Sequence, residues 1–220
     1  MGRGRALATV AGMAVAAYTA VQWLGRTYGS TPAERRAVLP GDDVVSRPQT
    51  VVTHAVTIDA SPERVWPWLV QMGWHRAGWY TARWVDRLLF PANDPSADTI
   101  VEGLQQLQVG DFIPDGPPET RCGFTVLGLV PDRHLLLHST SHLPLSWRVR
   151  DLARAEWTWV FVAQPRDGGR RTRLVFRWRC RAEPWWLDVG CRALVVPADL
   201  VMSRSMLEGL SRRLSAPAAA

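Results

Sequence analysis

Histidine is the side chain best suited to acid–base or metal chemistry near neutral pH. The chain has five histidines, which are His54, His75, His134, His138 and His142. None of them forms an HExxH motif, a His-x-His pair or a cluster with carboxylates at ligand spacing. No Gly-x-Ser-x-Gly motif and no glycine-rich phosphate loop is present either. The sequence therefore predicts no metal site and no cofactor, and it offers only His54 as a catalytic candidate.

His54 stands out because of the pattern that surrounds it. Residues 50–59 alternate, and Val52, Val56 and Ile58 fall on the same face as His54. Such alternation is typical of a strand with one buried face, so we expect His54 to point inward. Two interpretations stay open at this point. His54 is either a hydrogen-bonded core histidine or an acid/base that faces a pocket.

The clearest pattern in the chain is an aromatic face opposite a row of arginines. Residues 171–181 read RTRLVFRWRCR, so one face of a strand carries Leu174, Phe176 and Trp178 and the other carries arginine. The preceding run, 157–163, places Trp157, Trp159 and Phe161 on one face. We expect a hairpin that sets these aromatic residues side by side, as packed core or as the wall of a ligand cavity. The arginines are expected to face water; contact with anionic lipid headgroups is the preferred alternative, ahead of contact with nucleic-acid phosphates.

The remaining periodicities predict an α+β fold. A helix is expected at 61–72 and a second at 80–90. Further strands are expected at 109–113, 122–130, 134–140, 157–163 and 171–181. The last element is a helix over 186–214, in which Met202, Met206, Leu210 and Leu214 repeat every four residues. The order predicts a curved antiparallel sheet wrapped around a long C-terminal helix.

The N-terminal region differs in composition from the rest of the chain. Ala6 to Leu24 contains no charged residue and has the length of a membrane-spanning helix. A cleaved signal peptide and a buried core helix are the alternatives. Residues 25–48 are rich in Gly, Pro, Arg and Asp and are expected to be a linker. The predicted division is therefore an anchor with its linker over 1–45 and a ligand-binding domain over 46–215.

Composition sets limits on the function. The 220 residues carry a net charge of +6, and all 26 basic residues are arginine. Three cysteines without a C-x-x-C spacing exclude a disulfide scaffold. No helix-turn-helix, zinc-finger or RNP-type signature is present, so no nucleic-acid partner is expected. Cys180 and Cys191 are interpreted as small buried hydrophobic residues.

The chain resembles a known superfamily in one long motif. Its residues 54–80 read HAVTIDASPERVWPWLVQMGWHRAGWY. This motif, followed in order by VGDFIPDG, WTWVFVAQ, RTRLVFRWR and the C-terminal helix, is similar to a bacterial subgroup of the START-like, polyketide cyclase-like (SRPBCC) superfamily. The resemblance implies a helix-grip fold with a hydrophobic cavity between the sheet and the C-terminal helix. It implies no particular reaction.

These observations predict a single-pass protein of the bacterial cell membrane that binds a hydrophobic small molecule or lipid in an internal cavity. Two alternatives stay open: a polyketide cyclase or dehydratase-like enzyme that uses His54, and an envelope interaction module without a ligand. The expected ligand-binding residues are His54, Arg76, Trp79, Tyr80, Trp157, Trp159, Phe161, Leu174, Phe176, Trp178, Met202 and Met206.

Overall fold

A six-stranded sheet forms the centre of the protein. The computed structural model describes residues 2–89 and 91–215. The strand order is β1-β6-β5-β4-β3-β2, and every neighbouring pair is antiparallel. The strands are β1 (Thr50–Ile58), β2 (Phe112–Pro114), β3 (Gly123–Val130), β4 (His134–Ser139), β5 (Arg154–Arg166) and β6 (Arg171–Glu183). The predicted α+β class and the antiparallel sheet are confirmed.

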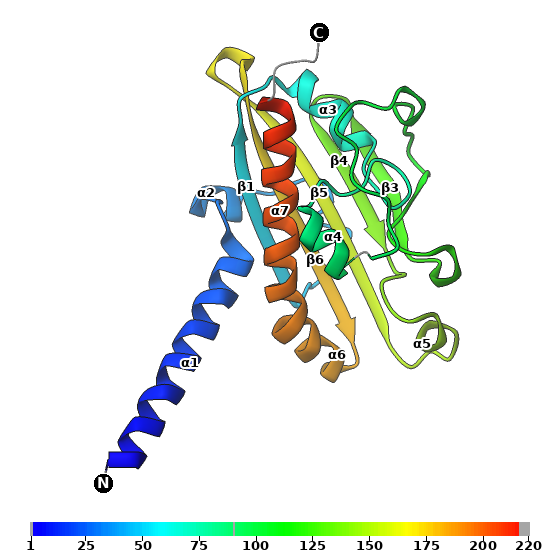
Figure 1. Ribbon diagram of the computed structural model, residues 1–220. Coiled ribbons are helices and arrows are strands. Elements are labelled where there is room, and N and C mark those ends of the chain that lie inside the picture. Colours follow the sequence, from blue (N-terminus) through cyan, green and yellow to red (C-terminus); the bar gives the residue numbers. More distant parts are fainter. Residues whose placement is uncertain (1, 90, 216–220) are drawn as a thin grey trace.

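One helix of 20 residues, α7, covers the inner face of this sheet. Figure 1 shows α7 lying along the sheet, with α6 leading into its lower end. The helices are α1 (Gly2–Thr27), α2 (Pro32–Arg36), α3 (Pro62–Val70), α4 (Arg83–Leu89), α5 (Leu145–Val149), α6 (Trp185–Gly190) and α7 (Val196–Ser215). A π-helical turn, η4 (Cys191–Val195), joins α6 to α7. The predicted long C-terminal helix is therefore confirmed.

The inner face of the sheet is the aromatic face that the strand pattern predicted. The register of β5 and β6 places Trp159 opposite Trp178 and Phe161 opposite Phe176. The rings of Phe161 and Phe176 stack with their centroids 4.7 Å apart. All four side chains are buried, as is the stripe of α7 that faces them, Met202, Met206, Leu210 and Leu214. A helix with an apolar residue at every fourth position buries that stripe against the sheet.

The outer face of the sheet differs from the prediction, because the arginine row is mostly covered. The side chain of Arg177 is 3% exposed, and those of Arg173 and Arg179 are 15% and 18% exposed. The ends of the row are much more exposed, with Arg171 at 45% and Arg181 at 42%. The expectation that the whole row faces water was therefore wrong.

The cover is the segment that was expected to be a linker. After α1 the chain turns at Gly29 and enters α2, which begins with a capping box: Thr31 Oγ1 accepts a hydrogen bond from the Glu34 amide and Glu34 Oε2 accepts one from the Thr31 amide. Leu39 and Val45 of this segment are both buried. Residues 28–45 thus belong to the folded domain and do not act as a free tether.

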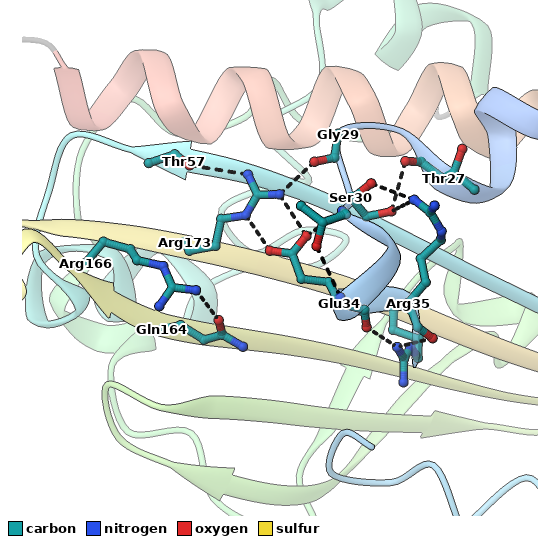
Figure 2. Close-up of polar contacts among 11 residues, drawn as sticks. Thr27, Gly29, Ser30, Glu34, Arg35, Thr57, Gln164, Arg166 and Arg173 are labelled. Atoms are coloured by element: carbon teal, nitrogen blue, oxygen red, sulfur yellow. Dashed lines mark hydrogen bonds and ion pairs between the residues drawn. The ribbon is translucent and has the colours of Figure 1, made fainter. Parts of the chain in front are cut away.

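Arginine–carboxylate pairs hold this segment in place. Figure 2 shows Arg173 reaching from β6 to Glu34, whose two carboxylate oxygens accept hydrogen bonds of 2.7 and 2.9 Å. The same guanidinium donates to the Gly29 carbonyl at 2.7 Å. The hydrogen bond from Arg173 is the main reason that the pKa of Glu34 falls to about 2. Four positions further along β6, Arg177 forms an ion pair with Asp42 at 2.6 Å.

Helix α1 contains the segment that was expected to span a membrane. It is continuous from Gly2 to Thr27 and leaves the body of the protein at its N-terminal end (Figure 1). Apolar side chains such as Val10, Met13 and Val15 are about 60% exposed along it. Within the part of the chain that the structure describes, no helix is both long enough and apolar enough to cross a membrane. The anchor over Ala6 to Leu24 therefore stays a prediction.

Candidate functional site

An apolar cavity lies between the inner face of the sheet and the start of α7. Its volume is about 420 Å³. Three strands supply one wall and the η4–α7 segment supplies the other. The lining residues are Phe124, His142, Trp157, Trp159, Trp178, Leu194, Val195, Ala198, Asp199 and Met202. The cavity is therefore built almost wholly from aromatic and aliphatic side chains, with one histidine and one aspartate.

The wall on the sheet side is a set of aromatic rings in mutual contact. Trp157 and Trp178 lie on β5 and β6 with ring centroids 5.2 Å apart. Trp159, the next inward residue on β5, contacts Phe124 of β3 at 4.5 Å. On the opposite wall, α7 presents the small side chain of Ala198. Both ring pairs are tilted, at 48° and 40°, so these rings form one continuous aromatic wall.

Asp199 is the acidic group of the cavity. Its Oδ2 atom accepts a hydrogen bond from Trp178 Nε1 at 2.7 Å, and its Oδ1 atom accepts one from Ser203 Oγ at 2.8 Å. The residue is 8% exposed. Burial raises the pKa of Asp199 to about 6, and the two hydrogen bonds oppose this shift. The carboxyl group therefore changes protonation state close to physiological pH.

His142 is the basic group of the cavity. Its Nδ1 atom lies 2.8 Å from Ser139 Oγ, and its Nε2 atom lies 2.9 Å from a carboxylate oxygen of Asp115. Burial alone would lower the pKa of His142, but the hydrogen bonds and charge of Asp115, with a contribution from Cys122, raise it to about 9. The imidazole is therefore protonated at neutral pH and donates to the carboxylate. Its ring lies tilted against that of Phe124, with the centroids 4.5 Å apart.

The structure places four of the twelve predicted ligand-binding residues in the cavity wall. These four are Trp157, Trp159, Trp178 and Met202. Four others are fully buried in the core and do not line the cavity: Phe161, Leu174, Phe176 and Met206. They lie further along the sheet, where α7 packs directly on the strands.

His54 lies away from the cavity and ties β1 to α1. It is fully buried, and its Nε2 atom lies 2.8 Å from the carbonyl oxygen of Gly25. Burial lowers the pKa of His54 to about 4, although the Gly25 carbonyl opposes the shift. The neutral ring therefore donates its Nε2 proton to that carbonyl. Tyr28 packs edge-on against the ring at 5.9 Å. Of the two interpretations of His54, these contacts are those of a hydrogen-bonded core histidine.

Of the other three predicted residues, Arg76 and Tyr80 stabilise the end of α3, and Trp79 packs against the cavity wall from behind. Arg76 donates to the carbonyl oxygens of Val70 and Met72 at 2.8 and 2.9 Å, which caps the C-terminus of that helix. Tyr80 is fully buried and donates its hydroxyl proton to the Trp68 carbonyl at 2.8 Å. Trp79 lies behind the cavity wall, with its ring 5.5 Å from that of Trp159. None of the three lines the cavity.

The sequence reasoning missed two polar groups of the cavity for different reasons. Asp199 lies three positions before Met202 and seven before Met206, so it shares the buried stripe of the last helix. That spacing is a signal that could have identified it. His142 lies in the loop after β4, where no periodicity indicates which way a side chain points. Its place in the cavity depends on Asp115, 27 residues earlier.

A second hollow, of about 550 Å³, is polar and lies at the ends of β5 and β6. Four of its six charged side chains are paired with one another: Arg154 with Asp151 at 2.7 Å and Arg181 with Glu183 at 2.6 Å. The other two have partners outside the lining, since Glu156 contacts His138 and Arg148 donates to the Leu143 carbonyl. Groups that satisfy one another offer little to a ligand, so the apolar cavity is the better candidate site.

No metal centre is found in the described part of the chain. Across residues 2–89 and 91–215, no three His, Cys, Asp or Glu side chains are arranged so that they could hold a metal ion. Cys180 and Cys191 are both buried, with their sulfur atoms 3.8 Å apart.

Comparison with known proteins gives structural likenesses only. No family model matches the chain, and no curated protein matches it. A solved protein from Nitrosospira multiformis is 14% identical, with a TM-score of 0.46, over 76% of this chain and 97% of its own. A hypothetical protein from Helicobacter pylori is 12% identical, with a TM-score of 0.45, over 80% and 94%. A protein from Arthrobacter aurescens is 15% identical, with a TM-score of 0.44, over 76% and 87%. Likenesses at this level assign no function to the chain.

Proposed function

We propose that this protein is a START-like, helix-grip domain that binds an apolar small molecule or lipid in the cavity between the sheet and α7, and that α1 holds it at a membrane. The observation that carries the proposal is the cavity itself. Its volume of about 420 Å³ lies in the range of small-molecule sites, and its wall is aromatic and aliphatic. Burial of a ligand's apolar surface there contributes about 25 cal/mol per Å².

The two polar groups of the cavity suggest the kind of ligand. Asp199 and His142 are the titratable side chains of the lining. A ligand with an apolar body and one hydrogen-bonding group would satisfy this arrangement. At neutral pH the imidazolium of His142 is neutralised by Asp115, so the wall favours a ligand that is mainly apolar.

The enzyme alternative needs an acid or base that is free to act on a ligand. His54 is engaged with Gly25 and lies outside the lining. Both ring nitrogens of His142 have partners, and so do both carboxylate oxygens of Asp199. Because these groups already have hydrogen-bond partners, their contacts favour ligand binding over catalysis. An interaction module with a side-chain-filled interior is disfavoured by the volume of the cavity.

The test is a matched pair of substitutions on one helix. Ala198 lines the cavity and is itself exposed, so Ala198→Trp fills the cavity without burying a new side chain in the packed core. Val201 lies on the same helix, is 40% exposed and does not line the cavity, so Val201→Trp is the control. A fluorescent fatty-acid probe should bind the wild type and the control equally. The Ala198→Trp variant should bind at least about tenfold more weakly, a loss of roughly 1.4 kcal/mol.

Native mass spectrometry of the purified protein supplies a second readout. A co-purified apolar molecule that is lost only from Ala198→Trp would support the proposal. Equal probe affinity in all three proteins, or no binding of any apolar probe to the wild type, would contradict it. Turnover of a bound molecule would instead support the enzyme alternative.

A further inference from the structure

Large apolar side chains gather at one end of the molecule, on α5, α6 and η4. Figure 1 shows α5 and α6 at the same end, and the rings of Trp147 on α5 and Trp186 on α6 make an edge contact at 5.5 Å. The most exposed of these side chains are Val149 at 77%, Trp185 at 75% and Leu194 at 72%. Exposed apolar residues normally occur singly, so a group of them on neighbouring elements indicates a contact surface.

Helix α1 joins this end of the molecule. Its Tyr18 hydroxyl donates to the Ala193 carbonyl at 3.0 Å, and its Gln22 side chain donates to the Arg192 carbonyl at 2.8 Å. Both carbonyls belong to η4. Residues 8–17 of α1 extend beyond this contact, and their side chains are exposed. The exposed apolar residues of α1 therefore adjoin η4, which carries the exposed Leu194 and Val195.

The charge of this end favours an anionic partner. Segments 145–154 and 181–195 together carry five arginines against three acidic residues. The two tryptophans of α6, Trp185 and Trp186, are 75% and 42% exposed. Tryptophan is enriched where protein meets the headgroup region of a bilayer, and basic residues attract anionic headgroups. Side chains that protrude this far are suited to insertion among lipids.

We infer that the end formed by α5, α6 and η4, which we name the docking face, rests on the surface of a bilayer that contains anionic lipid. The inference rests on the proposed membrane association of α1 and adds to it an orientation. The C-terminal part of α1 is fixed to the domain by the hydrogen bonds to η4 and by His54. A domain that is fixed to its anchor in this way cannot turn freely, so one end faces the lipid.

The docking face also bears on access to the cavity. Leu194 and Val195 line the cavity and are 72% and 38% exposed, so they stand at its mouth. Both belong to the docking face. An apolar ligand could then pass between bilayer and cavity without crossing water.

The test compares hydrogen exchange of the full-length protein with and without vesicles. The vesicles are phosphatidylcholine, with or without phosphatidylglycerol. Amide exchange should slow in α5, α6 and η4 when anionic vesicles are added, and it should not change in the distant hairpin at 164–171. Protection of α1 alone would overturn the docking face and leave the anchor standing. Protection of the docking face without vesicles, growing with protein concentration, would assign it to a second copy of the chain and overturn the inference.

A substitution pair gives an independent measure. Val189 on α6 is 51% exposed, and Val130 at the far end of β3 is 44% exposed. Val189→Asp should lower the vesicle partition coefficient about tenfold, because it removes apolar contact and adds a charge that anionic lipid repels. The vesicle partition coefficient of Val130→Asp should stay within about twofold of the wild-type value. Equal partitioning of the two variants would refute the inference.

Discussion

Replacement of Arg177 by alanine should destabilise the protein strongly, although Arg177 lies in a row that the sequence pattern assigned to water. The residue is 2% exposed. It donates to Asp42, to Thr53 Oγ1 and to the carbonyl oxygens of Glu34, Arg35 and Ala37, at distances from 2.6 to 3.2 Å. In the Arg177→Ala variant, all these acceptors lose a charged donor while the segment that carries most of them still covers the sheet.

The magnitude follows from these contacts. Removal of one partner from a buried ion pair costs about 3–5 kcal/mol, because the remaining charge is left without compensation. Asp42 retains a contact with Arg179 at 3.1 Å, and residues 28–45 can loosen to admit water. We therefore expect Arg177→Ala to lower the free energy of unfolding by about 3 kcal/mol, at the lower end of that range. Arg177→Lys keeps the charge but loses the planar guanidinium group that donates several hydrogen bonds at once. Its loss of unfolding free energy should therefore be smaller than that of Arg177→Ala but greater than zero.

The assay is urea unfolding followed by circular dichroism, with Arg181→Ala as the control. Arg181 belongs to the same row, but its side chain is 42% exposed and pairs with an exposed Glu183. Its loss should cost no more than about 0.5–1 kcal/mol. Limited proteolysis should also cut the Arg177→Ala variant faster within residues 28–45. Equal unfolding free energies for the two variants would refute the view that Arg177 is a buried anchor of this segment.

Three further predictions follow from the packing, the buried acid and α1. Phe176→Ala should lower the unfolding free energy by about 3–5 kcal/mol in the same assay, because Phe176 is fully buried; a cost below about 1 kcal/mol would contradict the close packing. Burial raises the pKa of Asp199 to about 6, above the value of about 3.9 in an unfolded chain, so its stability contribution is complete below about pH 4 and is lost as the pH rises through 6. The Asp199→Asn variant does not lose this stability. Its unfolding free energy minus that of the wild type should therefore rise by up to about 3 kcal/mol between about pH 4 and pH 7. A difference that does not change with pH would show that Asp199 does not titrate in this range. Full-length protein should fractionate with membranes through α1 and resist release by high salt, and release by salt alone would refute the anchor.

Local periodicity predicted the elements because each has one buried face. The alternation in 171–181 and in 157–163 identified β6 and β5 and the side that faces inward. The four-residue repeat from Met202 identified the buried stripe of α7. These patterns did not reveal which aromatic residues line the cavity, since that depends on where α7 meets the sheet. Phe176 is buried in the core outside the cavity lining, whereas Trp178, two residues further along, lines the cavity and donates to Asp199 of α7.

The covered arginine row was not predictable by the same reasoning. Burial of a charge is costly, so a row of arginines on one face of a strand normally indicates contact with water. Here the partners are Glu34 and Asp42, which look like ordinary polar residues of a linker. The contact between Arg173 and Glu34 joins positions that are 139 residues apart, so no local sequence pattern predicts it.

That separation also has a consequence for how the chain reaches its folded state. β1 pairs only with β6, and Glu34 meets Arg173 of the same late strand. On the ribosome, the first strand and the covering segment must therefore wait until nearly the whole domain has been synthesised. Folds dominated by such distant contacts form slowly, since the entropy of closing a long loop is lost before the contacts are gained. During that interval β1 is an unpaired, aggregation-prone edge, so the nascent chain should depend on chaperone protection more than its size suggests.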